Sequence, residues 1–160
     1  MAQSEIVKDA KSVMVVSSNN SLRDFIQCVL ENEGFQVVTA RTSVQALLIE
    51  SGIRRDIDLL ITNIGHGGFH NGLDLAFCFR VTRPKAKILF TSGGIFPMDR
   101  IGEALPDGGY ATIRTPFAPG QLSSVVKVIF QPMLSISQAS WNGSNMPLRS
   151  SESMKGMRIT

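Results

Sequence analysis

Five short apolar runs alternate along this chain with five stretches of helical periodicity, and that alternation restricts the folds it can adopt. The runs are rich in β-branched residues and are short, which is typical of strands buried on both faces. They span residues 13–16, 35–39, 57–62, 86–91 and 110–113. Strands that alternate with helices form right-handed βαβ units and therefore a mostly parallel sheet with helices on both faces. The pattern predicts a three-layer α/β sandwich.

Apolar residues at helical spacing follow each of the five runs. We expect Gly34 to end the first helix and Thr42 or Ser43 to cap the second. Pro119 should lie in the first turn of the fifth helix. The expected buried faces consist of Leu22, Phe25, Ile26, Val29 and Leu30; Val44, Leu47 and Leu48; Leu73, Ala76, Phe77 and Val81; Pro97, Met98, Ile101 and Leu105; and Leu122, Val125, Val126 and Ile129.

The alternation divides the chain into three parts. Residues 1–11 are predicted to be a polar leader and residues 12–130 one folded domain. Residues 131–160 contain seven serines and two prolines with no sustained period, which predicts a flexible tail. Trp141 either belongs to that flexible tail or docks on the domain.

Charge and composition exclude several classes of protein. Residues 12–130 contain eleven basic and ten acidic side chains and show no basic stripe, so we expect no nucleic-acid partner. No apolar run approaches the roughly 18–20 residues of a membrane helix, and the N-terminus lacks the apolar centre of a secretory signal. The expected location is the cytoplasm, without membrane association. No set of nucleophile, base and orienting group is evident, so we expect no enzyme.

Cysteine and histidine also give little reason to expect a metal site. Cys28 and Cys78 lie in apolar helical stretches without a Cys-x-x-Cys spacing and are predicted to be buried thiols. His66 and His70 are separated by glycines, which deny them a helix, and a third ligand is lacking. We therefore expect loop histidines in solvent and no metal.

The polar residues that end the predicted strands are the candidates for a functional site, because ligands of open α/β sheets bind beyond the carboxyl ends of the strands. Successive strand residues face opposite sides of the sheet, so Arg114 should point away from Thr115. The candidates are Ser17, Ser18 and Asn19; Thr62 and Asn63; Thr91 and Ser92; and Arg114 and Thr115. Only Arg114 among them is charged.

Five segments of the chain together resemble a known family. They are VMVVSS leading into NNSLR, ENEGFQVVTA, DIDLLITN followed by GHGGFHNGLDLA, ILFTSG, and TPF. With these segments, residues 13–130 resemble the receiver domain of bacterial two-component response regulators. The resemblance implies a flavodoxin-like domain whose five-stranded parallel sheet has the order 2-1-3-4-5 and carries five helices.

The resemblance also implies a site, which this chain has altered. In receiver domains an acidic pair and a third-strand aspartate hold Mg²⁺. A histidine kinase phosphorylates that aspartate, and a hydroxyl residue and a lysine bind the phosphoryl oxygens. The matching positions hold Ser17 and Ser18 for the acidic pair, Asn63 for the phosphoacceptor, Thr91 for the hydroxyl residue and Thr115 for the lysine. Only Thr91 keeps the residue type of the family.

Two further positions follow from the same resemblance. The Thr115–Pro116 bond should be cis, because the matching lysine-proline bond of receivers commonly is. Thr112 lies where the family usually has the aromatic residue of its output switch.

The chemistry of these residues predicts that phosphotransfer and Mg²⁺ binding are lost. Two hydroxyls and an amide offer Mg²⁺ no negative charge, and an amide does not form an acyl phosphate. Asp58 lies about 16 Å before Asn63 along the same strand, too far to substitute for it. Asp74 and Asp99 are expected to be solvated carboxylates at helix starts.

The sequence therefore leads to a main hypothesis and an alternative. The main hypothesis is a non-phosphorylatable pseudo-receiver in two-component phosphorelay signalling that acts by protein–protein binding. Its expected partners are a histidine kinase, a phosphotransfer protein, another response regulator or, as a homodimer, a second copy. Binding is expected on the first-helix face or on the fourth-helix to fifth-helix face. The alternative is a sensor that holds a nucleotide or metabolite in the uncharged crevice.

Overall fold

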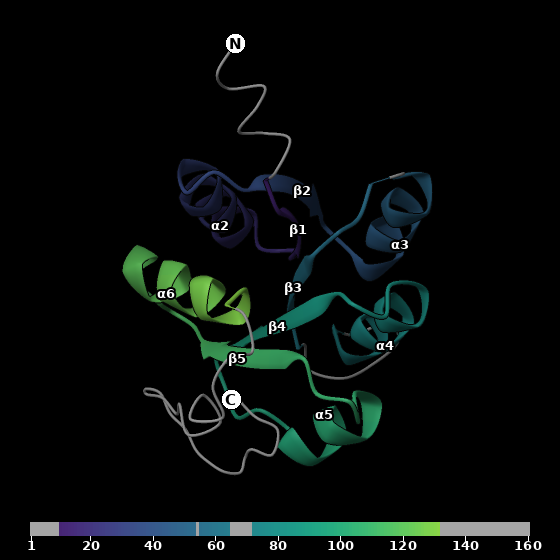
Figure 1. The fold of residues 1–160 in the computed structure, drawn as a ribbon. Coiled ribbons are helices and arrows are strands. Elements are labelled where there is room, and N and C mark those ends of the chain that lie inside the picture. Colours follow the sequence, from purple (N-terminus) through teal and green to yellow (C-terminus); the bar gives the residue numbers. More distant parts are fainter. Residues whose placement is uncertain (1–9, 54, 65–71, 132–160) are drawn as a thin grey trace.

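The computed structural model describes residues 10–53, 55–64 and 72–131, which form one parallel sheet flanked by helices (Figure 1). The sheet has five strands in the order β2-β1-β3-β4-β5. Every neighbouring pair is parallel, and β1 lies between β2 and β3. The predicted three-layer α/β sandwich and its strand order are confirmed.

The elements alternate strictly along the chain. The strands are β1 (Ser12–Val16), β2 (Gln36–Ala40), β3 (Leu59–Asn63), β4 (Lys87–Ser92) and β5 (Tyr110–Arg114). The helices are α2 (Asn20–Asn32), α3 (Ser43–Gly52), α4 (Gly72–Thr82), α5 (Met98–Ala104) and α6 (Pro119–Ile129). Two of the predicted helix signals are confirmed, since the Thr42 side chain caps α3 and Pro119 begins α6.

Two apolar cores lie on the two faces of the sheet. Helices α2 and α6 cover one face and α3, α4 and α5 cover the other (Figure 1). Alternating strand residues supply the two cores: Val13 and Val15 of β1 face α2 and α6, whereas Met14 and Val16 face the other three helices. Because the direction of each strand residue follows from this alternation, it also fixes where the residues at the strand ends point.

The predicted buried faces are confirmed for α2 and α6 but wrong in part for α3, α4 and α5. The exposed exceptions are Val44 and Leu48 of α3, at 49% and 69%, Phe77 and Val81 of α4, at 53% and 64%, and Met98 of α5, at 44%. The side chains that α4 buries are instead those of Leu75, Ala76 and Phe79, together with the glycine at its start. Helices α3 and α4 carry apolar residues on more than one side, so helical spacing alone does not identify the side that packs on the sheet.

The prediction that the two cysteines are buried thiols is also wrong, because Cys28 and Cys78 are both exposed. Cys28 lies two residues from both Ile26 and Leu30, the buried residues of α2. Two residues correspond to about 200° around a helix, which places the thiol on the solvent side. An apolar stretch of sequence is therefore a poor guide to the burial of a single cysteine within it.

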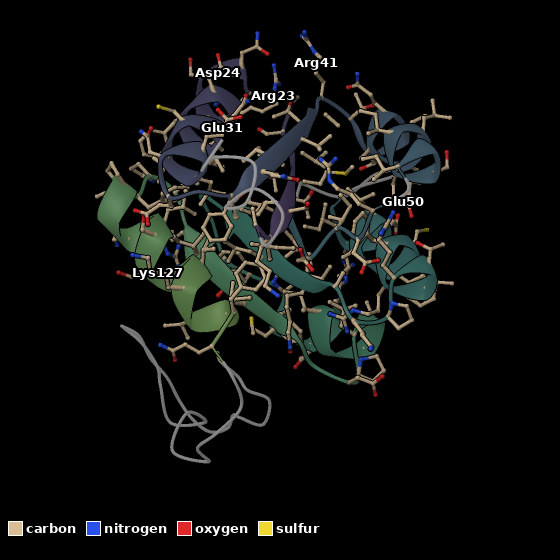
Figure 2. All side chains as sticks on the ribbon, turned by 45° about the horizontal axis from the view of Figure 1, so that its top comes forward. Arg23, Asp24, Glu31, Arg41, Glu50 and Lys127 are labelled. Atoms are coloured by element: carbon tan, nitrogen blue, oxygen red, sulfur yellow. The ribbon has the colours of Figure 1, made fainter. Side chains whose placement is uncertain are left out.

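Arg83 joins α4 to the end of α3 and to the loop before β3. Its Nε lies 2.9 Å from Glu50 Oε2, and the two side chains are only 15% and 12% exposed. Its two Nη atoms also donate to the carbonyls of Ile53 and Arg55, at 3.4 and 3.3 Å. Figure 2 shows Glu50 where α3 approaches α4. One guanidinium thus connects segments about 30 residues apart in the chain.

We expect Arg83→Ala to lower the free energy of unfolding by about 2–3 kcal/mol, because it leaves the largely buried Glu50 carboxylate without its cation. Urea titration followed by circular dichroism measures the change. The control is Lys127→Ala, which removes the exposed pair between Lys127 and Glu33; its side chains are 63% and 33% exposed. That variant should lose about 0.5 kcal/mol or less. Equal losses in the two variants would contradict the role given to Arg83.

Arg80 fixes the turn that leads from α5 into β5. Its Nη1 and Nη2 donate to the carbonyls of Gly108 and Gly109, at 2.9 and 3.0 Å. Both glycines have φ near +77°, a conformation that residues with a side chain rarely adopt. Burial lowers the pKa of Arg80, and the charge of Asp107 acts in the opposite direction. Arg80 thereby holds α4 and the start of β5 at a fixed separation.

Several predictions fall on residues outside the described ranges. These are most of the polar leader, the histidines His66 and His70, and the tail with Trp141. Within the described residues, no helix has both the length and the apolar character needed to cross a bilayer.

Candidate functional site

The strand register brings four of the predicted site residues to one edge of the sheet. Asn63, the last residue of β3, is paired with Thr91 of β4. The amide of Thr115 donates to the Ser92 carbonyl at the end of β4, at 2.9 Å. Ser17 follows directly on β1 and donates its amide to the Ala40 carbonyl at the end of β2, at 3.1 Å. The carboxyl ends of the five strands therefore meet where the sequence places the candidate site.

The same four residues also belong to one face of that edge. Ser17, Asn63, Thr91 and Thr115 each lie two residues beyond a strand residue of the core under α2 and α6. Since successive strand residues alternate between faces, all four side chains are directed toward the α2 and α6 side. Ser18 comes after the last strand residue and is exposed.

Burial and hydrogen bonding differ among the four residues. Thr91 and Ser17 are 2% and 7% exposed, whereas Asn63 and Thr115 are partly exposed. The Ser17 hydroxyl accepts a hydrogen bond from the Asn19 amide at 3.1 Å. The Thr91 carbonyl accepts from the Ile64 amide at 2.9 Å, which ties the end of β4 to the end of β3. The accessible polar groups here are hydroxyls and an amide, all without charge.

Arg23 brings a positive charge to this edge, and it was not among the residues that the sequence analysis singled out. Its Nη1 donates to the Ser17 carbonyl at 2.7 Å and its Nη2 to Asn20 Oδ1 at 2.6 Å. Figure 2 shows Arg23 on α2, the helix that leaves this edge. The arginine therefore fixes the loop from β1 to α2, and only the three-residue spacing of Asn20 and Arg23 could have indicated it.

Gly72 is a second residue of the site that the sequence did not identify. It begins α4, and a Cβ placed on it would overlap the Asn63 carbonyl oxygen and lie 2.8 Å from the carbonyl carbon. A real Cβ is not found so close to a backbone atom, so only glycine fits beside Asn63. In the sequence Gly72 is one more glycine of a glycine-rich loop, and its contact with β3 leaves no pattern there.

The loop after β4 and the turn after β5 also meet at this edge. A Cβ on Gly93 would lie 3.3 Å from the Thr115 hydroxyl, so the loop after β4 packs closely on Thr115. The Thr115–Pro116 bond is cis, as predicted. Arg114 donates to the Gly94 carbonyl at 2.9 Å and is exposed.

The three carboxylates that the sequence analysis considered as substitutes are not found with the four residues. Asp58 Oδ2 accepts a hydrogen bond from the Ser12 amide at the start of β1, at 2.8 Å, so it lies at the opposite edge of the sheet. This agrees with the prediction that Asp58 is too distant. Asp74 and Asp99 are exposed in the first turns of α4 and α5, where a carboxylate stabilises the helix. Among the described residues, no three His, Cys, Asp or Glu side chains are grouped as a metal site requires.

Solved structures of receiver proteins have the same fold as this chain. Chemotaxis protein CheY4 of Vibrio cholerae superimposes with a TM-score of 0.66 at 21% identity, over 76% of this chain and 99% of CheY4. A response regulator of Thermotoga maritima gives 0.64 at 27% identity, over 75% and 97% of the two chains. The NtrX receiver domain of Brucella abortus gives 0.62 at 24% identity, over 73% and 96%.

These likenesses define the fold of the described residues as the flavodoxin-like receiver fold. No protein-family model and no curated protein sequence matches the chain. The likeness therefore lies in the path of the backbone, and the side chains at the strand ends decide what the fold does here.

Proposed function

We propose that this chain is a pseudo-receiver: a protein of two-component signal transduction that cannot be phosphorylated at its acceptor position and acts by binding other proteins. The proposal depends on one observation above all, the position of Asn63. It ends β3, beside Thr91 and on the face shared with Ser17 and Thr115. A receiver of this topology has its phosphoacceptor there, and in this chain the residue is an amide.

The chemistry of an amide supports the loss of phosphotransfer. Phosphorylation of an aspartate requires a carboxylate oxygen to attack phosphorus while the phosphodonor leaves with the bonding electrons. The amide of Asn63 is neutral, and it is a far weaker nucleophile than a carboxylate. We therefore propose that the protein forms no acyl phosphate at Asn63 and has no enzymatic activity.

The donor set at the edge does not fit Mg²⁺ either. Magnesium binds hard, preferably charged oxygen ligands and gives up its water reluctantly. Ser17, Ser18 and Asn63 supply no carboxylate, and the Arg23 guanidinium lies on the Ser17 carbonyl. A cation beside the site opposes the binding of another cation. We propose that the protein works without a metal or another cofactor.

The partners that we propose are signalling proteins of the same kind of pathway: a histidine kinase, a phosphotransfer protein or another response regulator, in the cytoplasm. The known proteins with this fold include the chemotaxis response regulator CheY4 and the NtrX receiver. A chain that keeps this fold without an acceptor retains surfaces for binding and has lost the chemical step. Binding should therefore be independent of phosphodonors.

The proposed function predicts a protein indifferent to acetyl phosphate and Mg²⁺. After incubation with both, intact-mass spectrometry should show no added phosphoryl group, because Asn63 offers no carboxylate. Titration with millimolar MgCl₂ should leave the melting temperature unchanged, because ligands stabilise a fold only by binding it. An added phosphoryl mass that is lost on treatment with hydroxylamine, or a melting temperature that rises by several degrees with Mg²⁺, would refute the proposal.

A further inference from the structure

A pocket lies between α4 and α5, on the side of the sheet away from α2 and α6 (Figure 1). Its volume is about 540 Å³, and Leu73, Phe77 and Cys78 of α4 and Ala104 of α5 form its apolar lining. We refer to it as the α4–α5 pocket. Because residues 73–78 and residues 100–104 both contribute to the lining, these parts of the two helices lie at the same level.

The pocket belongs to the layer of helices that carries the exposed large apolar side chains. Six such side chains are found among the described residues, and all of them belong to α3, α4, α5 or the loop that enters α5. They are Val44, Leu48, Phe77, Val81, Ile95 and Met98. Within the described ranges, α2 and α6 contribute none. Single exposed apolar residues are common, but their restriction to one layer indicates a surface that another molecule covers.

Helix α4 directs a stripe of apolar side chains away from the sheet. Leu73, Phe77 and Val81 follow one another at four-residue spacing, so they lie along one side of the helix. Phe77 is 53% exposed and is the aromatic residue of the stripe. Aromatic side chains gain more from burial than most others, so this stripe favours contact with a second apolar surface.

Two charges of opposite sign lie beside the stripe. Arg100 and Glu103 of α5 line the α4–α5 pocket, and both are exposed. They are three residues apart, which is slightly less than one helical turn. Neither forms an ion pair or a hydrogen bond with another described residue. The third charged residue of the lining is Asp74, in the first turn of α4, and it already interacts within the chain.

This arrangement of side chains is complementary to itself. A two-fold axis across the middle of the pocket, perpendicular to the two helices, would place α5 of one copy antiparallel to α5 of another. Arg100 of each copy would then face Glu103 of the other, and every such contact would occur twice. The same axis would bring Leu73 of each copy to Phe77 of the other, because the midpoints of both pairs lie at the level of the pocket. A single symmetry operation would thus pair the charges and cover the apolar lining.

We propose that two copies of this chain associate through the α4–α5 pocket as an antiparallel, two-fold symmetric dimer with Phe77 at its centre. The interface is formed by the third and fourth helices along the chain, so it coincides with neither of the binding faces expected from the sequence. The inference goes beyond the proposed function and does not depend on whether Asn63 can be phosphorylated.

The reciprocal charges provide the sharpest test. Sedimentation velocity of the full-length protein, with a reductant and over a range of concentrations, measures the dissociation constant of the dimer. In Arg100→Glu and in Glu103→Arg, like charges face each other twice, so we expect each variant alone to have a dissociation constant at least about tenfold higher. An equimolar mixture of the two variants should regain the wild-type affinity, because every glutamate then faces an arginine in the mixed dimer.

The matched control is Asp24→Arg, which changes an exposed carboxylate on α2, in the opposite layer (Figure 2). It alters the net charge as much as Glu103→Arg does and should leave the dissociation constant unchanged. A wild type that remains monomeric at every concentration overturns the proposal. A mixture that associates no better than its two components also overturns it, and so does a dimer that neither charge reversal weakens.

The apolar centre of the interface is tested separately. We expect Phe77→Ser to raise the dissociation constant at least about tenfold, because an aromatic side chain is lost from the interface twice. Phe77→Leu keeps an apolar side chain and should raise it far less. Circular dichroism verifies that both variants fold. If the dimer of Phe77→Ser is as stable as that of the wild type, the copies meet elsewhere and the proposal is wrong.

The two exposed cysteines give a measurement on the unmodified sequence. Cys78 lines the α4–α5 pocket, whereas Cys28 lies on α2 in the opposite layer. We expect iodoacetamide to modify Cys78 more slowly as the protein concentration rises and Cys28 at a constant rate, with mass spectrometry following each cysteine. A rate at Cys78 that does not change across the concentrations at which the dimer forms would contradict the proposed interface.

Discussion

A chain in which Ser17→Asp, Ser18→Asp, Asn63→Asp and Thr115→Lys are combined is expected to accept a phosphoryl group from acetyl phosphate when Mg²⁺ is present. The strand register already brings positions 63 and 91 side by side and position 115 next to the end of β4. Three carboxylates at this edge supply the charged oxygen ligands that Mg²⁺ prefers. The carboxylate at position 63 can then attack phosphorus as acetate leaves, and the new lysine stabilises the phosphoryl oxygens.

The measurement is intact-mass spectrometry after incubation with the phosphodonor, together with the melting temperature in the presence and absence of Mg²⁺. Carboxylates close together repel one another, so Mg²⁺ should raise the melting temperature of the substituted chain and leave that of the wild type unchanged. The matched control keeps Asn63 and carries the other three substitutions; it should bind Mg²⁺ and remain unphosphorylated. A folded four-fold variant that neither binds Mg²⁺ nor gains mass would show that these positions do not form one site.

Gly72→Ala is expected to lower the free energy of unfolding by about 2–3 kcal/mol. The added Cβ would overlap the Asn63 carbonyl, and backbone atoms cannot move aside as a flexible side chain can. Overpacking that forces a backbone shift typically costs about 1–3 kcal/mol, and a contact with a central strand lies at the upper end. The end of β3 or the start of α4 must move, so the displacement falls on the candidate site itself.

Urea titration of Gly72→Ala measures this loss, and Gly120→Ala is the control. Nothing lies within 4 Å of a Cβ on Gly120, which is in the first turn of α6. That substitution should leave stability unchanged or raise it by up to about 1 kcal/mol, because alanine favours a helix over glycine. If the two variants are equally stable, the close contact between Gly72 and β3 does not constrain the domain.

The apolar runs of the sequence were sufficient to predict the sheet and the edge where the polar residues gather, and the resemblance to receiver domains implied the order of the strands. Strands buried on both faces require continuous β-branched runs, and such runs are visible without a structure. The ends of these strands were less certain: Ile57 and Asp58 precede β3 and are not part of it, and Asn63 is its last residue. Boundaries shift by a residue or two because pairing with neighbouring strands, and not composition, sets where a strand ends.

The predictions failed where a residue contacts a segment far away in the chain. The orientation of α3 and α4 depends on which apolar side meets the sheet, and both helices offer more than one. The contact of Gly72 with Asn63 is made by backbone, which a pattern of side chains cannot reveal. Arg83 and Glu50 are 33 residues apart, and each appears in the sequence as an ordinary surface charge.

A sheet edge composed of hydroxyls and one amide has a further consequence for how such a protein could be controlled. Receivers that carry an aspartate alternate between two chemical forms, and a kinase sets the ratio. Under the proposed function, a chain with Asn63 in that place has a single form, so the amount of any complex it enters would vary with the number of copies in the cell. Synthesis and turnover of the protein would then set the strength of its signal.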